Sequence, residues 1–389
     1  MIACNGRLAS SSASKTKRVR ERPRIAMVSA NAYPVMGGVE THVYEVAPRI
    51  AAAGFDVTIL TTDLSTELPQ RDEIRGVPVI RVPAAPRERD YYWAPDIYRT
   101  IGREKWGLVH CQGYHTLVAP LAMAASTRNR TPYVVTFHSG GHDSATRNRM
   151  RSTQHLVLRP LLRRAARLIA VSGWEARHFA TELRLGRNRF AVIPNGAELG
   201  VPAGSVPASA EAVDRDTPLI VSVGRLERYK GHQRVIAAFP ELLTLVPGAR
   251  LRIVGGGPYD AELRRLAQAS GVGERIDIGP VDARDRAGMA ALLSSAAVVV
   301  AMSEYESQGI AVLEALALRR RVVVADTSAL SEFARDGVAR GVPLDAPAPQ
   351  LAQAIYDELH GPLRPAYELP TWDECAAALA RLYTEVLAA

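Results

Sequence analysis

Residues 298–332 constrain the fold of this chain more than any other stretch. The apolar, β-branched run at 298–300 has the character of a strand buried in a parallel sheet. A polar loop at 303–309, a helical stretch at 310–318 and a second apolar run at 322–325 follow it. This order of strand, loop, helix and strand is typical of α/β proteins, so we expect a parallel sheet covered by helices.

Two carboxylates and one helix start belong to this unit. Glu306 lies in the loop, and Glu314 lies eight residues later, on the helix face that also holds Ile310. Gly309 and Ile310 begin the helix, where backbone N–H groups can bind an anion. A nucleotide sugar carries phosphate groups between two rings that bear hydroxyl groups. An anion-binding helix start with one carboxylate on each side therefore suits a nucleotide sugar. The spacing alone is equally consistent with an alternative in which Glu306 is an exposed acid on a surface loop and Glu314 is a solvated acid on a helix.

The Glu-x7-Glu spacing in this context resembles the retaining glycosyltransferases of family 4, which have the GT-B fold. The resemblance covers residues 24–389 and implies that Glu306 faces the donor sugar, while Glu314 binds the ribose hydroxyls. The chain departs from the family at two positions. The family usually has an aromatic residue at Gln308, which we expect to contact the donor, and a glycine at Arg320.

The length of 389 residues favours two domains. The resemblance implies two facing, doubly wound, Rossmann-like α/β domains, with a C-terminal helix that crosses back to the first. We expect a disordered basic tail at 1–23, an acceptor-side domain at 24–200 plus 367–389, a linker at 201–217, and a nucleotide-sugar-binding domain at 218–366. The linker prediction follows from a stretch rich in Ala, Pro, Gly and Ser.

Charge and cysteine content exclude several classes of protein. The net charge is +8, but residues 1–24 carry seven basic residues and one acid, which leaves about +2 for the body. This excess is too small to indicate a nucleic-acid partner. The three cysteines form no C-x-x-C pair, so we expect a reducing cytoplasm. Seven arginines at 147–167 fit a solvated helix face, or a phosphate-bearing or lipid-linked acceptor and peripheral contact with the inner membrane face.

Further candidate residues follow other predicted strands. Ligand-binding loops in open α/β sheets gather at the carboxyl ends of strands. Gly38 begins a helix, where the missing side chain lets the backbone approach a ligand; a plain tight turn is the alternative. His138 follows the apolar run at 133–137, and the resemblance implies that it faces the donor sugar. His115 and His142 are more often structural or solvated in such loops.

Two cations indicate how a diphosphate is held. Arg225 and Lys230 follow the strand predicted at 219–223, and together they can neutralise a diphosphate without a metal ion. The glycine run around Gly256 fails as a dinucleotide fingerprint but is placed to bind the donor, and the resemblance implies that Val281 contacts the base. The Asp-x-Asp pattern at 214–216 follows no strand, so we expect neither a metal nor a cofactor.

These observations predict a retaining glycosyltransferase of polysaccharide or glycoconjugate biosynthesis. It would move a sugar from a UDP- or GDP-sugar to an acceptor hydroxyl and form an α-glycosidic bond. The expected partners are the nucleotide-sugar donor and a sugar, lipid-linked or small-molecule acceptor. Two alternatives stay open, a nucleotide-sugar epimerase of the same fold and a non-catalytic nucleotide-sugar binder.

Overall fold

The computed structural model describes residues 22–35, 37–65, 67–86, 92–114, 116–138, 145–199, 216–282, 285–365 and 367–389, with backbone alone at 145–153. Nearly all of the predicted tail at 1–23 and linker at 201–217 lies outside these ranges. Among the helices described, none is long and apolar enough to cross a membrane.

The first half of the chain forms one sheet whose described strands follow the order β3-β4-β2-β1-β5-β6-β7-β8. All neighbours pair in parallel except β3 and β4. The strands are β1 (Arg24–Ser29), β2 (Asp56–Asp63), β3 (Arg71–Ile74), β4 (Val77–Pro83), β5 (Leu108–Gln112), β6 (Tyr133–Thr136), β7 (Arg167–Ala170) and β8 (Phe190–Val192). The helices are α1 (Gly38–Ala52), α2 (Pro95–Arg103), α3 (Val118–Asn129), α4 (Ala145–Arg164) and α5 (Gly173–Glu182).

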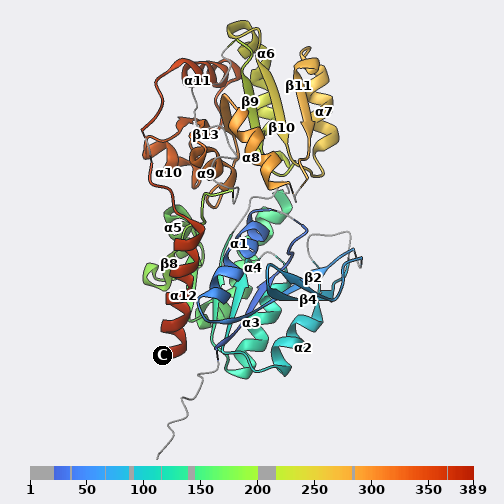
Figure 1. The fold of residues 1–389 in the computed structure, drawn as a ribbon, viewed down its shortest axis with the longest axis vertical. Coiled ribbons are helices and arrows are strands. Elements are labelled where there is room, and N and C mark those ends of the chain that lie inside the picture. Colours follow the sequence, from blue (N-terminus) through green and yellow to red (C-terminus); the bar gives the residue numbers. More distant parts are fainter. Residues whose placement is uncertain are drawn as a thin grey trace, which may run out of the picture.

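The second half forms a sheet with the described order β11-β10-β9-β12-β13-β14, parallel throughout. Its strands are β9 (Leu219–Val223), β10 (Arg250–Val254), β11 (Ile276–Gly279), β12 (Val298–Ala301), β13 (Arg321–Ala325) and β14 (Arg340–Val342). Its helices are α6 (His232–Leu245), α7 (Asp260–Ala269), α8 (Arg286–Ser295), α9 (Ile310–Ala317), α10 (Leu330–Arg335) and α11 (Ala348–His360). Figure 1 shows the two sheets one above the other, each flanked by helices.

Continuous apolar strands explain why both sheets are covered on both faces. A strand with helices on each side buries every side chain, and Val298, Val299 and Val300 are each at most 1% exposed. In the first sheet, Met27 and Val28 of β1 enter separate cores on opposite faces. The prediction of two Rossmann-like α/β domains is therefore confirmed.

The turn after α9 contains one residue in the left-handed backbone conformation, Arg319, with φ of 59°. Arg320, where the family usually has a glycine, is not among the described residues with positive φ.

The last helix, α12 (Trp372–Ala388), returns to the first sheet and packs along α1. Figure 1 shows it in red beside the lower set of helices. Thr371 and Glu374 form a capping box that starts it. The Trp372 indole N–H donates to the Glu198 carbonyl at 3.0 Å. Gly196 contacts Trp372 so closely that any side chain at 196 would clash with the tryptophan backbone.

Trp372→Ala should destabilise the protein more than any exposed change on α12. Trp372 is 1% exposed, and emptying such an indole site typically costs about 3–5 kcal/mol. Glu385→Ala, at an exposed position of the same helix, is the matched control. Urea denaturation followed by circular dichroism and fluorescence measures both. Equal midpoints for the two variants would contradict the view that α12 is anchored through Trp372.

Candidate functional site

Two helix starts lie next to one another where the two sheets meet. Gly38 begins α1 just beyond β1, and Gly309 caps α9 just beyond β12, with φ of 88°. A Cβ added to Gly38 would lie 3.7 Å from Cδ1 of Ile310, so the two starts face each other across the boundary. The N-terminal N–H groups of a helix lack partners inside it, and the helix dipole adds positive potential. The boundary therefore offers an anion two such ends.

A partly buried ion pair lies beside these helix starts, with the Lys230 and Glu306 side chains 15% and 19% exposed. The Lys230 ammonium donates to Oε1 of Glu306 at 2.6 Å, and the Ser303 hydroxyl donates to the same oxygen at 2.9 Å. The Glu306 backbone N–H donates to Oγ of Ser328 at 2.9 Å. Burial is the largest single influence on the pKa of Lys230 and lowers it, but Glu306, Tyr229 and Glu227 together outweigh burial and raise the pKa above its ordinary value. Lys230 is therefore held charged at a fixed position.

Arg225 lies at the same boundary, on the loop after β9. Its side chain is 62% exposed and pairs with Glu227 at 2.8 Å. The next residue, Leu226, donates its N–H to the Gly256 carbonyl at 3.0 Å, which brings the glycine loop alongside. A Cβ added to Gly256 would meet nothing within 4 Å, so its Cα faces open space. Val281 is partly buried against the hydrophobic core of the second sheet.

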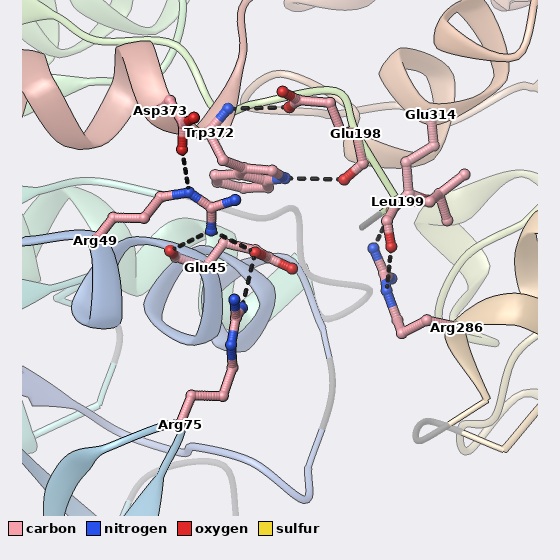
Figure 2. Close-up of polar contacts among 9 residues, drawn as sticks. All are labelled: Glu45, Arg49, Arg75, Glu198, Leu199, Arg286, Glu314, Trp372 and Asp373. Carbon is pink, nitrogen blue, oxygen red and sulfur yellow. Dashed lines mark hydrogen bonds and ion pairs between the residues drawn. The ribbon is translucent and has the colours of Figure 1, made fainter. Parts of the chain in front are cut away.

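Glu314 points toward the boundary from the middle of α9. Arg286, the first residue of α8, donates to its carboxylate at 3.0 Å and to the Leu199 carbonyl at 3.3 Å (Figure 2). Burial raises the pKa of Glu314, Arg286 opposes that rise, and the charge of Glu45 adds to it. Glu314 is thus a buried acid whose orientation is set by one arginine.

Glu45 of α1 belongs to a second charged group at the boundary. Figure 2 shows its carboxylate between Arg49 and Arg75, at 2.7 and 3.2 Å. Arg49 also donates to Asp373 at 2.6 Å, at the start of α12. These contacts fix α1 against the returning helix and so hold the Gly38 end in place.

His138 lies at the end of β6 and is linked to the second domain by a chain of contacts. It has φ of 45°, and its Nε2 lies 2.9 Å from Oε1 of Gln112. Its ring packs edge-on against His42, with centroids 4.6 Å apart. Nδ1 of His42 lies 2.7 Å from Oδ1 of Asn195. Burial lowers the pKa of His42 to about 4, so this ring is neutral at pH 7.

Gln308 completes this chain. The Asn195 backbone N–H donates to Oε1 of Gln308 at 2.9 Å, which joins the loop after β8 to the loop before α9. The Gln308 side chain, which we expected to contact the donor, therefore accepts a hydrogen bond from the other domain. His115 and His142 lie outside the described residues.

Sequence reasoning missed three residues of this boundary: Glu40, His42 and Arg286. Glu40 folds back over the start of α1, since a Cβ on Gly37 would lie 2.6 Å from its Oε2. Burial raises the pKa of Glu40, and the positive charge of Arg225 lowers it. For Glu40, an acid placed two residues after Gly38 was a signal that the sequence offered. For Arg286 the sequence offered no signal, because 28 residues separate it from Glu314.

The described residues contain no group of three His, Cys, Asp or Glu side chains arranged to hold a metal ion. The polar groups described at the boundary include cations, single carboxylates and backbone N–H groups, beside the uncharged side chains of His42, Asn195 and Gln308. Such groups bind an anionic, hydroxyl-rich molecule through charge and hydrogen bonds.

Comparisons with known proteins agree with this geometry. Residues 36–200 match the family described as Glycosyltransferase Family 4, and residues 208–368 match Glycosyl transferases group 1. The chain is 30% identical to a D-inositol 3-phosphate glycosyltransferase of Nocardiopsis dassonvillei, over 81% of each chain. It is also 30% identical to a phosphatidyl-myo-inositol mannosyltransferase of Mycobacterium tuberculosis, over 86% of each chain.

Solved structures show the same fold. Sucrose-phosphate synthase from Thermosynechococcus elongatus matches with a TM-score of 0.76 and 24% identity, over 94% of this chain and all of that one. HepE of Anabaena, solved with UDP and glucose, matches with a TM-score of 0.67 and 19% identity, over 94% and 97%. The chain therefore belongs to glycosyltransferase family 4 and has the GT-B fold.

Proposed function

We propose that this glycosyltransferase transfers a sugar from a UDP- or GDP-sugar to an acceptor hydroxyl and retains the α configuration. The observation that carries the proposal is the Lys230–Glu306 ion pair beside two facing helix starts. A cation and two N-terminal helix ends suit a diphosphate, and a carboxylate suits a sugar. The solved structure of HepE with UDP and glucose, a protein of the same fold, supports the choice of donor class.

The diphosphate is the leaving group in this reaction. As the bond from the sugar carbon to the phosphate oxygen breaks, negative charge grows on the diphosphate. Lys230, Arg225 and the N–H groups at Gly309 and Ile310 stabilise that charge in place of a metal ion. An ammonium has three donors, and Lys230 uses one on Glu306, so it can contact both the carboxylate and the diphosphate.

The two carboxylates have different tasks. The sugar ring gains positive charge in the transition state, and Glu306 faces it with a fixed negative charge. His138 lies on the opposite domain and contacts the sugar through hydrogen bonds. Glu314 binds the ribose hydroxyls, with Arg286 holding its carboxylate in orientation. The acceptor proton passes to the departing phosphate oxygen.

The acceptor binds on the side of the boundary that the first domain forms. Along α4, Leu156 and Val157 are each 68% exposed, and Arg163 and Arg164 are also exposed. Exposed apolar side chains beside basic ones favour contact with an anionic membrane surface. Two relatives are named for inositol phosphate and phosphatidyl-inositol acceptors. A phosphate-bearing or lipid-linked acceptor at a membrane surface therefore fits this chain.

A donor panel tests the proposed activity. Purified protein is incubated with UDP- and GDP-sugars, with and without cell-extract acceptors, and release of nucleoside diphosphate is measured. We expect release with one donor class, dependent on acceptor and unchanged by EDTA. Turnover of donor alone into an epimer would indicate the epimerase, binding without release would indicate the non-catalytic binder, and loss in EDTA restored by Mg²⁺ would refute metal independence.

Lys230→Ala and Arg225→Ala should each reduce turnover strongly. Removing one preorganised electrostatic contact to a leaving group typically costs on the order of 100-fold in kcat. Arg275→Ala, an exposed arginine of the same domain, is the matched control and should keep the wild-type rate. Near-normal turnover in both site variants would show that the diphosphate is bound elsewhere.

Glu306→Gln and Glu314→Ala should fail differently. Glu306 stabilises charge that appears only in the transition state, so its neutral isostere should mainly lower kcat. Glu314 binds a ribose that does not change, so its loss should mainly raise the donor KM. Donor-saturation kinetics at fixed acceptor separate the two effects. Wild-type kcat in Glu306→Gln, or lower kcat at unchanged KM in Glu314→Ala, would show that these roles are wrongly assigned.

A further inference from the structure

An aromatic cluster joins α5 of the first domain to the loop that carries Glu306. Trp174, Arg177 and His178 lie at helical spacing, so they share one face of α5. The Tyr305 ring packs edge-on against Trp174, with centroids 5.0 Å apart, and lies 6.0 Å from the His178 ring. The Trp174 and His178 rings stack on each other at 4.7 Å. The residue next to Glu306 in the sequence is therefore packed against the opposite domain.

An ion pair lies beside this cluster. Arg177 donates to Oε1 of Glu332 at 2.8 Å, and Glu332 belongs to α10 of the second domain. A Cβ added to Gly173, the first residue of α5, would lie 3.1 Å from the same oxygen, so the two helices approach closely. Figure 1 shows α5 just below α9 and α10. One face of α5 thus contacts the second domain at two points, through aromatic rings and through charge.

Three successive side chains of the loop have partners on three different elements. Glu304 pairs with Arg234 of α6 at 2.8 Å, and Glu306 pairs with Lys230, both within the second domain. Tyr305, between them, packs against the first domain instead. The loop is therefore tied to both domains at the point where Glu306 lies.

A further contact from the first domain lies on the other side of Glu306. The Asn195 backbone N–H donates to Gln308, two residues after Glu306. Tyr305 and Gln308 thus bracket Glu306 with contacts to the first domain. If the α5 contact were lost, the loop would keep only one of these two supports. A reacting group that is misplaced by about 1 Å can cost on the order of 100-fold in rate.

We propose that Trp174 and Tyr305 are positioning residues for the transfer reaction, because packing of α5 on Tyr305 sets the orientation of Glu306. This inference rests on the proposed role of Glu306 toward the donor sugar. Edge-to-face contacts between aromatic rings have a preferred geometry, so they suit the task of fixing a loop. Glu306 acts on charge that develops in the transition state, so loss of its orientation should lower kcat more than it raises the donor KM.

Amide hydrogen exchange, followed by mass spectrometry, tests the structural part without any turnover. The N–H groups of Glu304, Glu306 and Ala329 all have hydrogen-bond acceptors in the second domain. We expect Trp174→Ala to raise their exchange rates severalfold, because the loop loses a support. Trp93→Ala, at a tryptophan of the first domain that is 51% exposed, is the matched control and should leave them unchanged. Wild-type exchange of these amides in Trp174→Ala would overturn the proposal.

Donor-saturation kinetics at fixed acceptor test the catalytic part. Trp174→Ala should lower kcat about tenfold and keep the donor KM within about twofold of wild type. Trp174→Phe, which keeps a ring against Tyr305, should restore most of the lost rate. If Trp174 acts through Glu306, its loss should change kcat by about twofold or less in a Glu306→Gln background. In a Glu314→Ala background, the same change should still cost about tenfold.

Two kinetic results would overturn the proposal. One is wild-type kcat in Trp174→Ala, and the other is a full, multiplicative loss when Trp174→Ala is combined with Glu306→Gln. Absence of any turnover in the wild-type protein would refute the proposed function instead. In that case the exchange rates alone decide whether α5 fixes the loop that carries Glu306.

Discussion

The close approach of Gly38 and Ile310 is the contact on which the rest of this site depends. It brings the start of α1 and the start of α9 together, although they belong to different sheets. Parallel strands make this possible, because every helix that follows a strand begins at the same edge of its sheet. When two such sheets face each other, their helix starts and loop residues meet at one boundary. Lys230, Glu306 and Glu314 all lie at that boundary for this reason.

The charges at the boundary are held by partners on different elements. Lys230 and Glu306 come from loops after β9 and β12, and Arg286 of α8 orients Glu314 on α9. Removing charges from water is costly, so a partly buried pair such as Lys230 and Glu306 gains from good geometry and further hydrogen bonds. Ser303 supplies one such bond to Glu306. In the proposed donor complex, the diphosphate meets cations that are already in place, so little reorganisation is needed when charge develops.

The sequence predicted the elements well, because their patterns are local. The apolar run at Val298 and the loop and helix around Glu306 and Glu314 appear in the structure as expected. Contacts between distant segments were not predictable. Nothing near Gln308 indicated that its side chain would bind the Asn195 backbone, and nothing near Arg286 indicated Glu314.

Backbone geometry set a second limit. The turn after α9 contains one left-handed residue, Arg319, which no local sequence pattern marked.

The stereochemistry of transfer tests the central claim most directly. If the boundary holds an α-linked nucleotide sugar with its diphosphate between Lys230 and the α9 start, attack occurs on the face that the diphosphate leaves. Proton NMR of the anomeric signal of the transfer product reports its configuration, which is stable because a glycoside does not interconvert its anomers in water. We predict that the product is the α-glycoside. Formation of the β-glycoside would contradict this account, because inversion requires a base on the opposite face of the sugar.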